Sequence, residues 1–308
     1  MTDRVLVVGG TGLLGSAVAA HLAERGDAVT VMSRRAAGEG DPPAVTGLAR
    51  LVADYAAEDL DERLLQGFDA VVFAAGADIR HLPADADEDG FWRRAQVEGV
   101  PRFAAKAAAA GVGRFVQLGS YYHQLHPEWA STLPYVAARQ AADERTRALT
   151  GDGFAAITLN PPSIVGALPG RSLRGWARMI AWVRGELAQP ELFAPPGGTN
   201  YMSLRSLVQA VAGALTRGEP GRAYLIGDAN LAYRDYFQLL ADAAGSSRVI
   251  PVRDEEQPFQ PDRFIVQGRG RTISYEPDAA EVALLGYARD DVADALRRIV
   301  DDASTLAR

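Results

Sequence analysis

Three residues near the middle of the chain have the types and the spacing that proton transfer needs. Ser120 ends the apolar run RFVQLGS, and Tyr135 and Arg139 follow in PYVAAR, a segment that Pro134 can open as a helix. A spacing of four residues places Tyr135 and Arg139 on one face of that helix. A phenol has an unperturbed pKa of about 10, so it acts near neutral pH only where a nearby cation stabilises the phenolate. Arg139 is such a cation, and the three residues predict general acid–base chemistry.

The N-terminal segment VLVVGGTGLLG predicts a binding site for a dinucleotide pyrophosphate. Four apolar residues run into Gly9, Gly12 and Gly15, and the amphipathic run LLGSAVAAHLAERG follows. Gly9 allows a tight turn, Gly12 lets phosphates approach the backbone, and Gly15 lets the helix lie close to the sheet. Free N–H groups at the helix start, at Leu13 and Leu14, then face the anion. A glycine-rich turn without a ligand is the alternative.

The end of the second predicted strand indicates which dinucleotide binds. An NAD site usually has an acidic residue there, about 20 residues past the glycines, whereas this chain has Ser33, Arg34 and Arg35. A guanidinium forms charge-assisted bonds to a 2′-phosphate, and Ser33 adds a hydroxyl, so NADP is the predicted cofactor. The alternative is a solvated arginine loop. Asp54, after the third strand, is predicted to meet the adenine amino group, or else to cap the next element.

Apolar runs and helical runs alternate through the first half of the chain. Strands are predicted at 5–8, 28–32, 50–52, 70–74, 115–118 and 155–159, and helices at 13–25, 59–66, 91–110 and 134–149. This alternation predicts an α/β Rossmann fold, a doubly wound parallel sheet. Prolines interrupt the pattern after Asn160. We therefore expect an NADP-binding domain over 1–160 and a smaller, mainly substrate-binding domain over 161–308, from which about 200–227 returns to the sheet.

Composition narrows the class of partner. The 308 residues contain no run of 18 apolar residues and lead directly into a strand, which predicts a cytoplasmic protein without a membrane partner. The absence of cysteine excludes disulfides and thiolate chemistry. A net charge of −7 argues against nucleic acid, so a small-molecule substrate is expected. The sequence does not decide the oligomeric state, and a homodimer stays an open alternative.

Several motifs occur in an order that resembles a known family. They are GGTGLLG, the AAGA run of Ala74–Ala77, Ser120, YVAAR, and Asn160 followed by Pro161 and Pro162. Together they resemble the extended short-chain dehydrogenase/reductase family, including its dihydroflavonol reductase-like and NAD-dependent epimerase/dehydratase-like branches. The resemblance covers nearly the whole chain and is strongest up to Pro162.

The resemblance implies a role for each matching residue. In that family a serine polarises the substrate oxygen, a tyrosine transfers the proton, and a lysine holds the nicotinamide ribose and lowers the tyrosine pKa; these roles carry over to Ser120, Tyr135 and position 139. The further cofactor contacts that it implies are Ala74, Ala75, Gly76, Pro161 and Pro162. The chain departs from the family at Arg139, because the usual lysine is replaced by a larger, planar cation. It departs again at Gln96, where asparagine is frequent, and at Gly119, where a second serine is common.

Residues around these motifs are predicted to meet the substrate. They are Tyr121, Tyr122, His123, Asn160 and Trp176. The two tyrosines and the tryptophan have a plainer alternative: the tyrosines close the pocket, and the tryptophan lies in the core. His123 with His126 forms an HxxH pattern, but on a loop this is more often no metal site, and no metal is predicted.

These observations predict an NADP(H)-dependent oxidoreductase that interconverts a carbonyl and an alcohol. The segment after Pro162 supplies aromatic side chains and only scattered arginines, which favours an apolar or aromatic substrate. Two alternatives remain open: a nucleotide-sugar epimerase or dehydratase, and a non-catalytic dinucleotide sensor or scaffold of the same fold.

Overall fold

The chain divides into two compact units. The computed structural model describes residues 3–306. The first unit runs up to Pro161 and adds Val208–Ile226 and Asp278–Tyr287; the second unit takes Pro162–Leu207, Gly227–Pro277 and the chain from Ala288 onward. Residues 278–287, which the sequence analysis assigned to the second domain, belong to the first unit. Their helix is α9, Ala279–Leu285.

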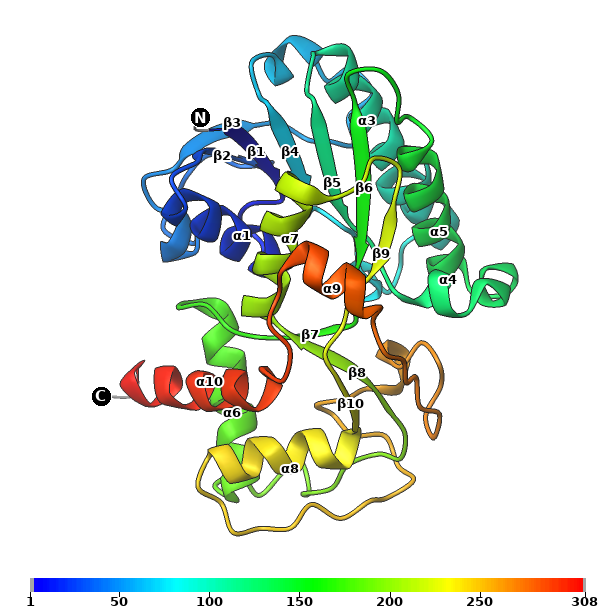
Figure 1. Cartoon of the computed structure of the whole chain (residues 1–308). Helices are drawn as coiled ribbons and strands as arrows, with labels where there is room; N and C mark the ends of the chain where they lie inside the picture. The colour runs from blue at the N-terminus through cyan, green and yellow to red at the C-terminus, as the bar shows by residue number, and fades with distance from the viewer. Residues whose placement is uncertain (1–2, 307–308) are drawn as a thin grey trace. The chain divides into compact units, whose positions relative to one another are not determined.

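A seven-stranded parallel sheet forms the centre of the first unit (Figure 1). Its order is β3-β2-β1-β4-β5-β6-β9. The strands are β1 Arg4–Val8, β2 Ala28–Ser33, β3 Ala49–Val52, β4 Ala70–Phe73, β5 Arg114–Leu118, β6 Ala155–Asn160 and β9 Ala223–Leu225. The chain order reverses between β1 and β4, and open α/β sheets bind ligands beyond the carboxyl ends of the strands at such a point. The doubly wound fold predicted from the sequence is confirmed.

Helices cover both faces of this sheet. The helices of the unit, besides α9, are α1 Leu13–Glu24, α2 Glu88–Trp92, α3 Gly99–Ala109, α4 Tyr122–Leu125, α5 Pro134–Arg147 and the second half of α7, Leu204–Arg217. In Figure 1, α1 lies on one side of the sheet and α3 with α5 on the other. Short 3-10 turns occur at Pro43–Val45, Glu62–Leu65, Ile79–His81 and Pro127–Ser131. The apolar core includes Phe73, Phe103 and Phe115, whose rings lie 5.8 to 6.3 Å apart.

Two of the predicted helices were wrong in part. The predicted helix at 59–66 is only the 3-10 turn Glu62–Leu65, which the Asp61 carboxylate caps by accepting from the Arg63 N–H. The predicted helix at 91–110 is interrupted by a π-helical segment, Arg93–Val97. Pro101 has no N–H to donate to the Val97 carbonyl, which instead accepts from Arg145 at 3.1 Å.

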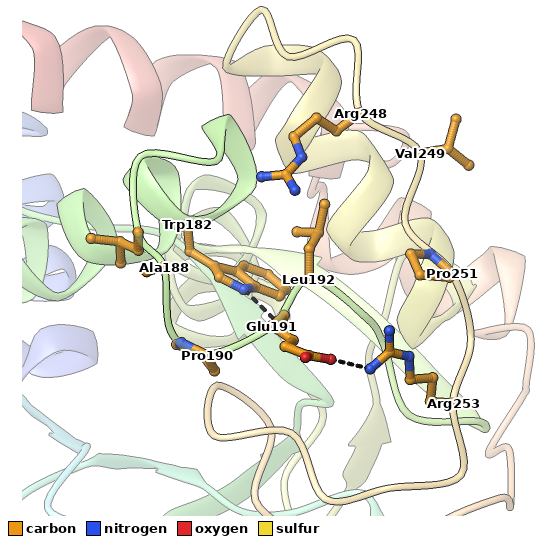
Figure 2. Close-up of a pocket in the computed structure, with 10 residues that line it drawn as sticks. Trp182, Ala188, Pro190, Glu191, Leu192, Arg248, Val249, Pro251 and Arg253 are labelled. Atoms are coloured by element: carbon orange, nitrogen blue, oxygen red, sulfur yellow. Dashed lines mark hydrogen bonds and ion pairs between the residues drawn. The ribbon is translucent and has the colours of Figure 1, made fainter.

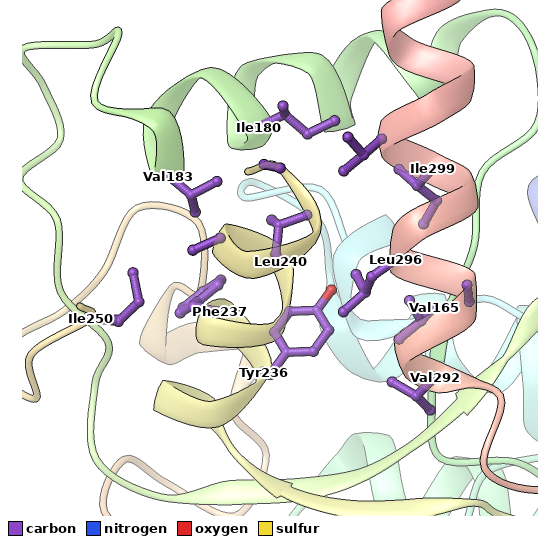
Figure 3. Packing of buried hydrophobic residues seen from close by; sticks show 14 of the residues in the cluster. Val165, Ile180, Val183, Tyr236, Phe237, Leu240, Ile250, Val292, Leu296 and Ile299 are labelled. Carbon is purple, nitrogen blue, oxygen red and sulfur yellow. The ribbon is translucent and has the colours of Figure 1, made fainter. Parts of the chain in front are cut away.

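The second unit is built on a smaller sheet of order β10-β8-β7. Its strands are β7 Ser163–Val165, β8 Gly198–Ser203 and β10 Ala229–Ala232, and its helices are α6 Arg171–Arg184, α8 Tyr233–Ala243, α10 Val292–Leu306 and the 3-10 turn Asp262–Phe264. Three long helices, α6, α8 and α10, contact one another. Figure 3 shows Leu240 of α8 between Ile180 of α6 and Leu296 of α10 in their shared core. Residues 198–203 thus belong to this smaller sheet. The rest of the segment predicted to return to the large sheet is mostly in the first unit, as Val208–Ile226, and its strand β9 joins the large sheet.

None of the helices within residues 3–306 is long and apolar enough to cross a membrane.

Candidate functional site

The glycine-rich turn after β1 lies against the end of β4. Gly9 has a φ of +79°, and a Cβ at this position would come within 2.8 Å of the Ala75 backbone. A Cβ on Gly15 would lie 2.2 Å from the Gly9 carbonyl oxygen. Any side chain at Gly9 or Gly15 would therefore separate the strand, the helix and the neighbouring loop. The turn lies where the strand order reverses, and it leaves backbone free to approach a ligand.

The start of α1 presents backbone N–H groups at this turn. Gly12 is the N-cap residue, and its carbonyl accepts from the Ser16 N–H at 2.9 Å, the first intrahelical bond. The N–H groups of Leu13, Leu14 and Gly15 precede that bond and point out of the helix. The first turn carries no acidic side chain. This geometry suits an anion such as a pyrophosphate, and the glycine positions fit a dinucleotide.

A pocket of about 310 Å³ lies beyond the ends of β2 and β3, and it is lined by Thr11, Ser33, Arg34, Arg35, Asp41 and Arg50. Three of these residues were predicted to choose the cofactor. Arg50 was not predicted as a site residue, because it lies inside a strand. The signal that could have found it is a charged residue in a short strand that is otherwise apolar. Its Nη1 donates to Ser33 Oγ at 3.1 Å, and its Nη2 pairs with Asp41 at 2.8 Å.

The structure brings Ser120 and Tyr135 together. Ser120 follows β5, and Tyr135 lies in the first turn of α5, which Pro134 opens. Their side chains form a hydrogen bond, and both residues are buried. Burial raises the pKa of Tyr135 above its usual value, while the Arg139 charge and the Ser120 bond act to lower it. The phenol is therefore protonated at neutral pH and is a proton donor.

Arg139 lies one helical turn beyond Tyr135 and reaches towards two strand ends. Its Nη2 donates to the Leu118 carbonyl at 2.9 Å. A Cβ on Gly76 would lie 2.7 Å from Arg139 Nη1, so the glycine after β4 makes room for the guanidinium. The residue is 6 % exposed, and its Nε has no partner in the described part of the chain. A lysine would not fill this planar space in the same way.

Asn160 fixes the backbone of Ser120. Its Oδ1 accepts from the Ser120 N–H at 2.9 Å, and its Nδ2 donates to Gln124 Oε1 at 2.9 Å. A Cβ on Gly119 would lie only 1.9 Å from Asn160 Oδ1. The geometry therefore leaves no room for a side chain at position 119. Asn160, predicted as a substrate contact, has its amide engaged inside the protein.

Aromatic side chains surround Tyr135. The Trp92 ring lies 5.2 Å from it and the Tyr122 ring 6.2 Å, measured between centroids. The Tyr121 and Tyr122 rings lie 4.2 Å apart at the start of α4. Trp92 was missed by sequence reasoning, because it lay inside the long predicted helix at 91–110. These rings form an apolar wall beside the phenol.

The π-helical segment and the loop after β4 complete the surroundings. Gln96 donates from Nε2 to the Ala77 carbonyl at 3.1 Å, and its buried Oε1 has no partner within residues 3–306. Asp78 in the same loop pairs with Arg80 at 2.7 Å and acts to raise the pKa of Tyr135. Such π-helical segments occur frequently at functional sites.

Two other predicted site residues make local contacts. Asp54 accepts from the Ala56 N–H at 3.0 Å, a turn of the capping kind that the sequence analysis left open. His123 is buried, and its Nε2 lies 2.8 Å from Asp143 Oδ2. The described residues contain no group of three metal-ligating side chains. Pro161 ends the first stretch of the first unit, and Pro162 begins the second unit.

The second unit contains Trp176 and a cavity of about 520 Å³. Trp176 packs against the unit's core, and its indole N–H donates to the Gly166 carbonyl at 3.2 Å. Figure 2 shows the cavity, which none of the predicted site residues lines. Trp182 lies at its base, and the Glu191 and Arg253 side chains pair at its edge.

Comparisons with known proteins agree with this architecture. The model of the NAD dependent epimerase/dehydratase family matches residues 5–227, and the chain belongs to that family. The resemblance found in the sequence is thereby confirmed. A comparison with curated proteins found no significant match.

Solved structures share the fold over their full length. Gox2253 is similar with 20 % identity and a TM-score of 0.75, covering 100 % of this chain and 99 % of that one. UDP-N-acetylglucosamine 4-epimerase from Bacillus cereus has 15 % identity and a TM-score of 0.72, covering 98 % and 99 %. MoeE5, solved in complex with UDP-glucose and NAD, has 19 % identity and a TM-score of 0.72, covering 99 % and 100 %. At these identities the likeness shows the fold alone.

Proposed function

We propose that this protein binds a nicotinamide dinucleotide and uses it to oxidise an alcohol carbon of a nucleotide sugar, returning the hydride within the same catalytic cycle. The reaction class is therefore epimerisation or dehydration, with no net redox change. The observation that carries the proposal is the buried hydrogen bond between Ser120 and Tyr135 with Arg139 one turn away. Family membership and the UDP-sugar proteins of similar fold support the substrate class.

The residues of the chain act on the substrate oxygen. Ser120 donates a hydrogen bond to that oxygen and holds it beside Tyr135. Tyr135 takes the hydroxyl proton as the alcohol becomes a carbonyl and gives the proton back in reverse. Only the phenolate form of Tyr135 can take that proton, and the positive charge of Arg139 stabilises the phenolate before the proton is taken and after it is given back. The chemistry that a bound nicotinamide supplies is the acceptance and return of one hydride, which balances the two electrons of the C–H bond.

The test is turnover of sugar nucleotides by the purified protein. UDP-, dTDP- and GDP-sugars are incubated with catalytic NAD⁺ or NADP⁺, and products are identified by mass and by the configuration of each ring carbon. We expect one sugar nucleotide to be converted without net reduction of cofactor, and the Tyr135→Phe variant to be inactive. Dinucleotide binding without conversion of any sugar nucleotide would contradict the proposal.

A second candidate is an NADP-dependent reductase of an apolar or aromatic carbonyl compound. The arginine-lined pocket beyond β2 and β3 favours NADP, and the rings of Trp92 and Tyr122 favour an apolar substrate beside Tyr135. Stoichiometric NADPH consumption with a bulky aromatic ketone, and none with sugar nucleotides, would favour this candidate. Binding of the dinucleotide with no turnover in either screen would instead leave a sensor or scaffold.

A further inference from the structure

The Arg50 side chain is an unusual feature of the pocket beyond β2 and β3. It comes from inside β3, and only 9 % of the side chain is exposed. Its Nε is buried without a partner in the described residues, and the rest of the guanidinium contacts Ser33 and Asp41. A buried guanidinium with an unpaired N–H indicates a site built to hold a further acceptor.

Asp41 is the single acidic residue among the residues that line this pocket. Its carboxylate accepts from the Gly38 N–H at 3.1 Å as well as pairing with Arg50, so a short turn holds it over the guanidinium. Arg34 and Arg35 add two exposed cations to the same pocket. The pocket therefore has an excess of positive charge even with Asp41 ionised.

We propose that Arg50 selects the cofactor by binding the 2′-phosphate of NADP, and that Asp41 occupies Arg50 whenever that phosphate is absent. The proposal rests on the dinucleotide binding of the proposed function, but it is independent of the substrate. A phosphate monoester carries a charge of about −1.5 to −2 and three acceptor oxygens, so it competes with a carboxylate for a fork of N–H donors. No covalent bond changes; one anion replaces another.

This exchange gives Asp41 a role opposite to that of Arg50. When NADP binds, Asp41 must release the guanidinium and remain close to a like charge, which weakens binding. When NAD binds, the Arg50–Asp41 pair stays intact. Asp41 thus reduces the preference for NADP, whereas Arg50 creates it, and substitutions at the two positions have effects of opposite sign on one measured quantity.

The experiment compares dissociation constants for NADPH and NADH by fluorescence titration, with 2′,5′-ADP and 5′-AMP as probes of the adenosine end. Arg50→Gln should weaken NADPH and 2′,5′-ADP by about tenfold or more while NADH and 5′-AMP change less than about twofold. Asp41→Asn should tighten NADPH and 2′,5′-ADP by about threefold to tenfold. Asp61→Asn, at an exposed Asp–Arg pair outside the pocket, is the matched control and should change neither.

The outcomes separate this proposal from the proposed function. A parent protein that binds neither dinucleotide overturns both. A parent that binds NADH as tightly as NADPH, or an Arg50→Gln variant that keeps the NADPH preference, overturns the role of Arg50 alone. Equal weakening of NADPH and NADH would mean that Arg50 supports the fold. Unchanged NADPH binding in Asp41→Asn overturns the exchange, and this variant keeps the buried arginine in place.

Discussion

The protonation state of Tyr135 decides how the candidate site works. Burial keeps the phenol of Tyr135 protonated. It can act as a base only after it has lost this proton, and a nearby cation is needed to stabilise the resulting phenolate. Tyr135→Phe keeps the ring and its contact with Trp92 but removes the transferable proton. We expect turnover to fall by about a hundredfold or more, with dinucleotide affinity nearly unchanged. Full activity would mean that another group, such as Tyr122, carries the proton.

The charge of Arg139 should affect how the reaction rate depends on pH. Its charge lowers the pKa of Tyr135, so removing the charge raises that pKa further. Oxidation of an alcohol requires the phenolate, and its rate rises with pH through the tyrosine pKa. Arg139→Gln should therefore move the rise of the oxidation rate to higher pH, while Arg139→Lys should keep it nearer the parent's. Identical pH profiles in parent and Arg139→Gln would remove the guanidinium from the proton-transfer step.

The sequence selects the residues of this candidate site, but not the contacts that they make. Ser120, Tyr135 and Arg139 could be selected because each follows an identifiable strand end or helix start. The positions of Trp92 and Arg50 depend on which strands and helices become neighbours, and no spacing along the chain encodes that. The hydrogen bonds of Asn160 with Ser120 and Gln124 could not be predicted for the same reason.

At the scale of elements, Asn160 at the end of β6 forms hydrogen bonds with Ser120 after β5 and with Gln124 of α4, and Gly119 lies against its side chain. Gly119→Ala would place a Cβ 1.9 Å from Asn160 Oδ1 and so displace the amide that holds the Ser120 N–H. We expect a loss of stability of about 1 to 3 kcal/mol and a lower kcat. Gly175→Ala is the control, since a Cβ there meets no atom within 4 Å. A fully active, equally stable Gly119→Ala protein would show that this fastening is dispensable.

Helices α4 and α5 are joined by a buried hydrogen bond between His123 and Asp143. Burial acts to raise the pKa of Asp143, but hydrogen bonds from His123 and Arg147 outweigh it and lower that pKa to about 2. A lowered pKa stabilises the fold above the carboxyl's unfolded value near 4, and this stabilisation is lost as pH falls towards 2. Asp143→Asn should therefore lower the free energy of unfolding by about 2 kcal/mol at pH 7 and by much less near pH 2.

The measurement for this pair is urea unfolding at both pH values. Glu144→Gln, on the exposed side of the same helix, is the matched control and should change stability little at either pH. If Asp143→Asn and the parent differ equally at both pH values, the loss comes from packing and not from the charge.

The elements themselves were predicted where local signals agree with tertiary packing. All six strands predicted in the first half are present, and each of them except β3 buries at least half of its residues. The helix predicted at 59–66 failed because the Asp61 cap and Gly67, at a φ of +79°, favour a short turn. The interruption at 93–97 follows from Pro101, whose missing N–H was visible in the sequence but whose effect on the preceding turn was not.

At the scale of the whole molecule, the two units do not correspond to two continuous halves of the sequence. The first unit gathers three separate stretches, the last of them Asp278–Tyr287, and a Cβ on Gly213 of α7 would lie 1.8 Å from the Leu285 carbonyl oxygen of that stretch. Such a close approach needs the finished fold, and nothing local in 278–287 marks it. Family membership and fold class, in contrast, follow from motifs in the first 162 residues.

All residues proposed to hold the dinucleotide, apart from Pro162, lie in the first unit, so its binding should stabilise that unit selectively. At a concentration of 100 times Kd, NADP⁺ should add about 2.7 kcal/mol to the free energy of unfolding, because it binds the folded state alone.

Amide hydrogen exchange followed by mass spectrometry measures which segments the bound dinucleotide protects. We expect slower exchange in the turn at Gly9–Gly15 and at the ends of β2 and β4, and little change around Leu240 in the core of the second unit. The same titration on Arg50→Gln should give less protection with NADP⁺ and unaltered protection with NAD⁺. Uniform protection of both units, or protection confined to the second, would contradict this assignment of the cofactor to the carboxyl ends of β1 and β4.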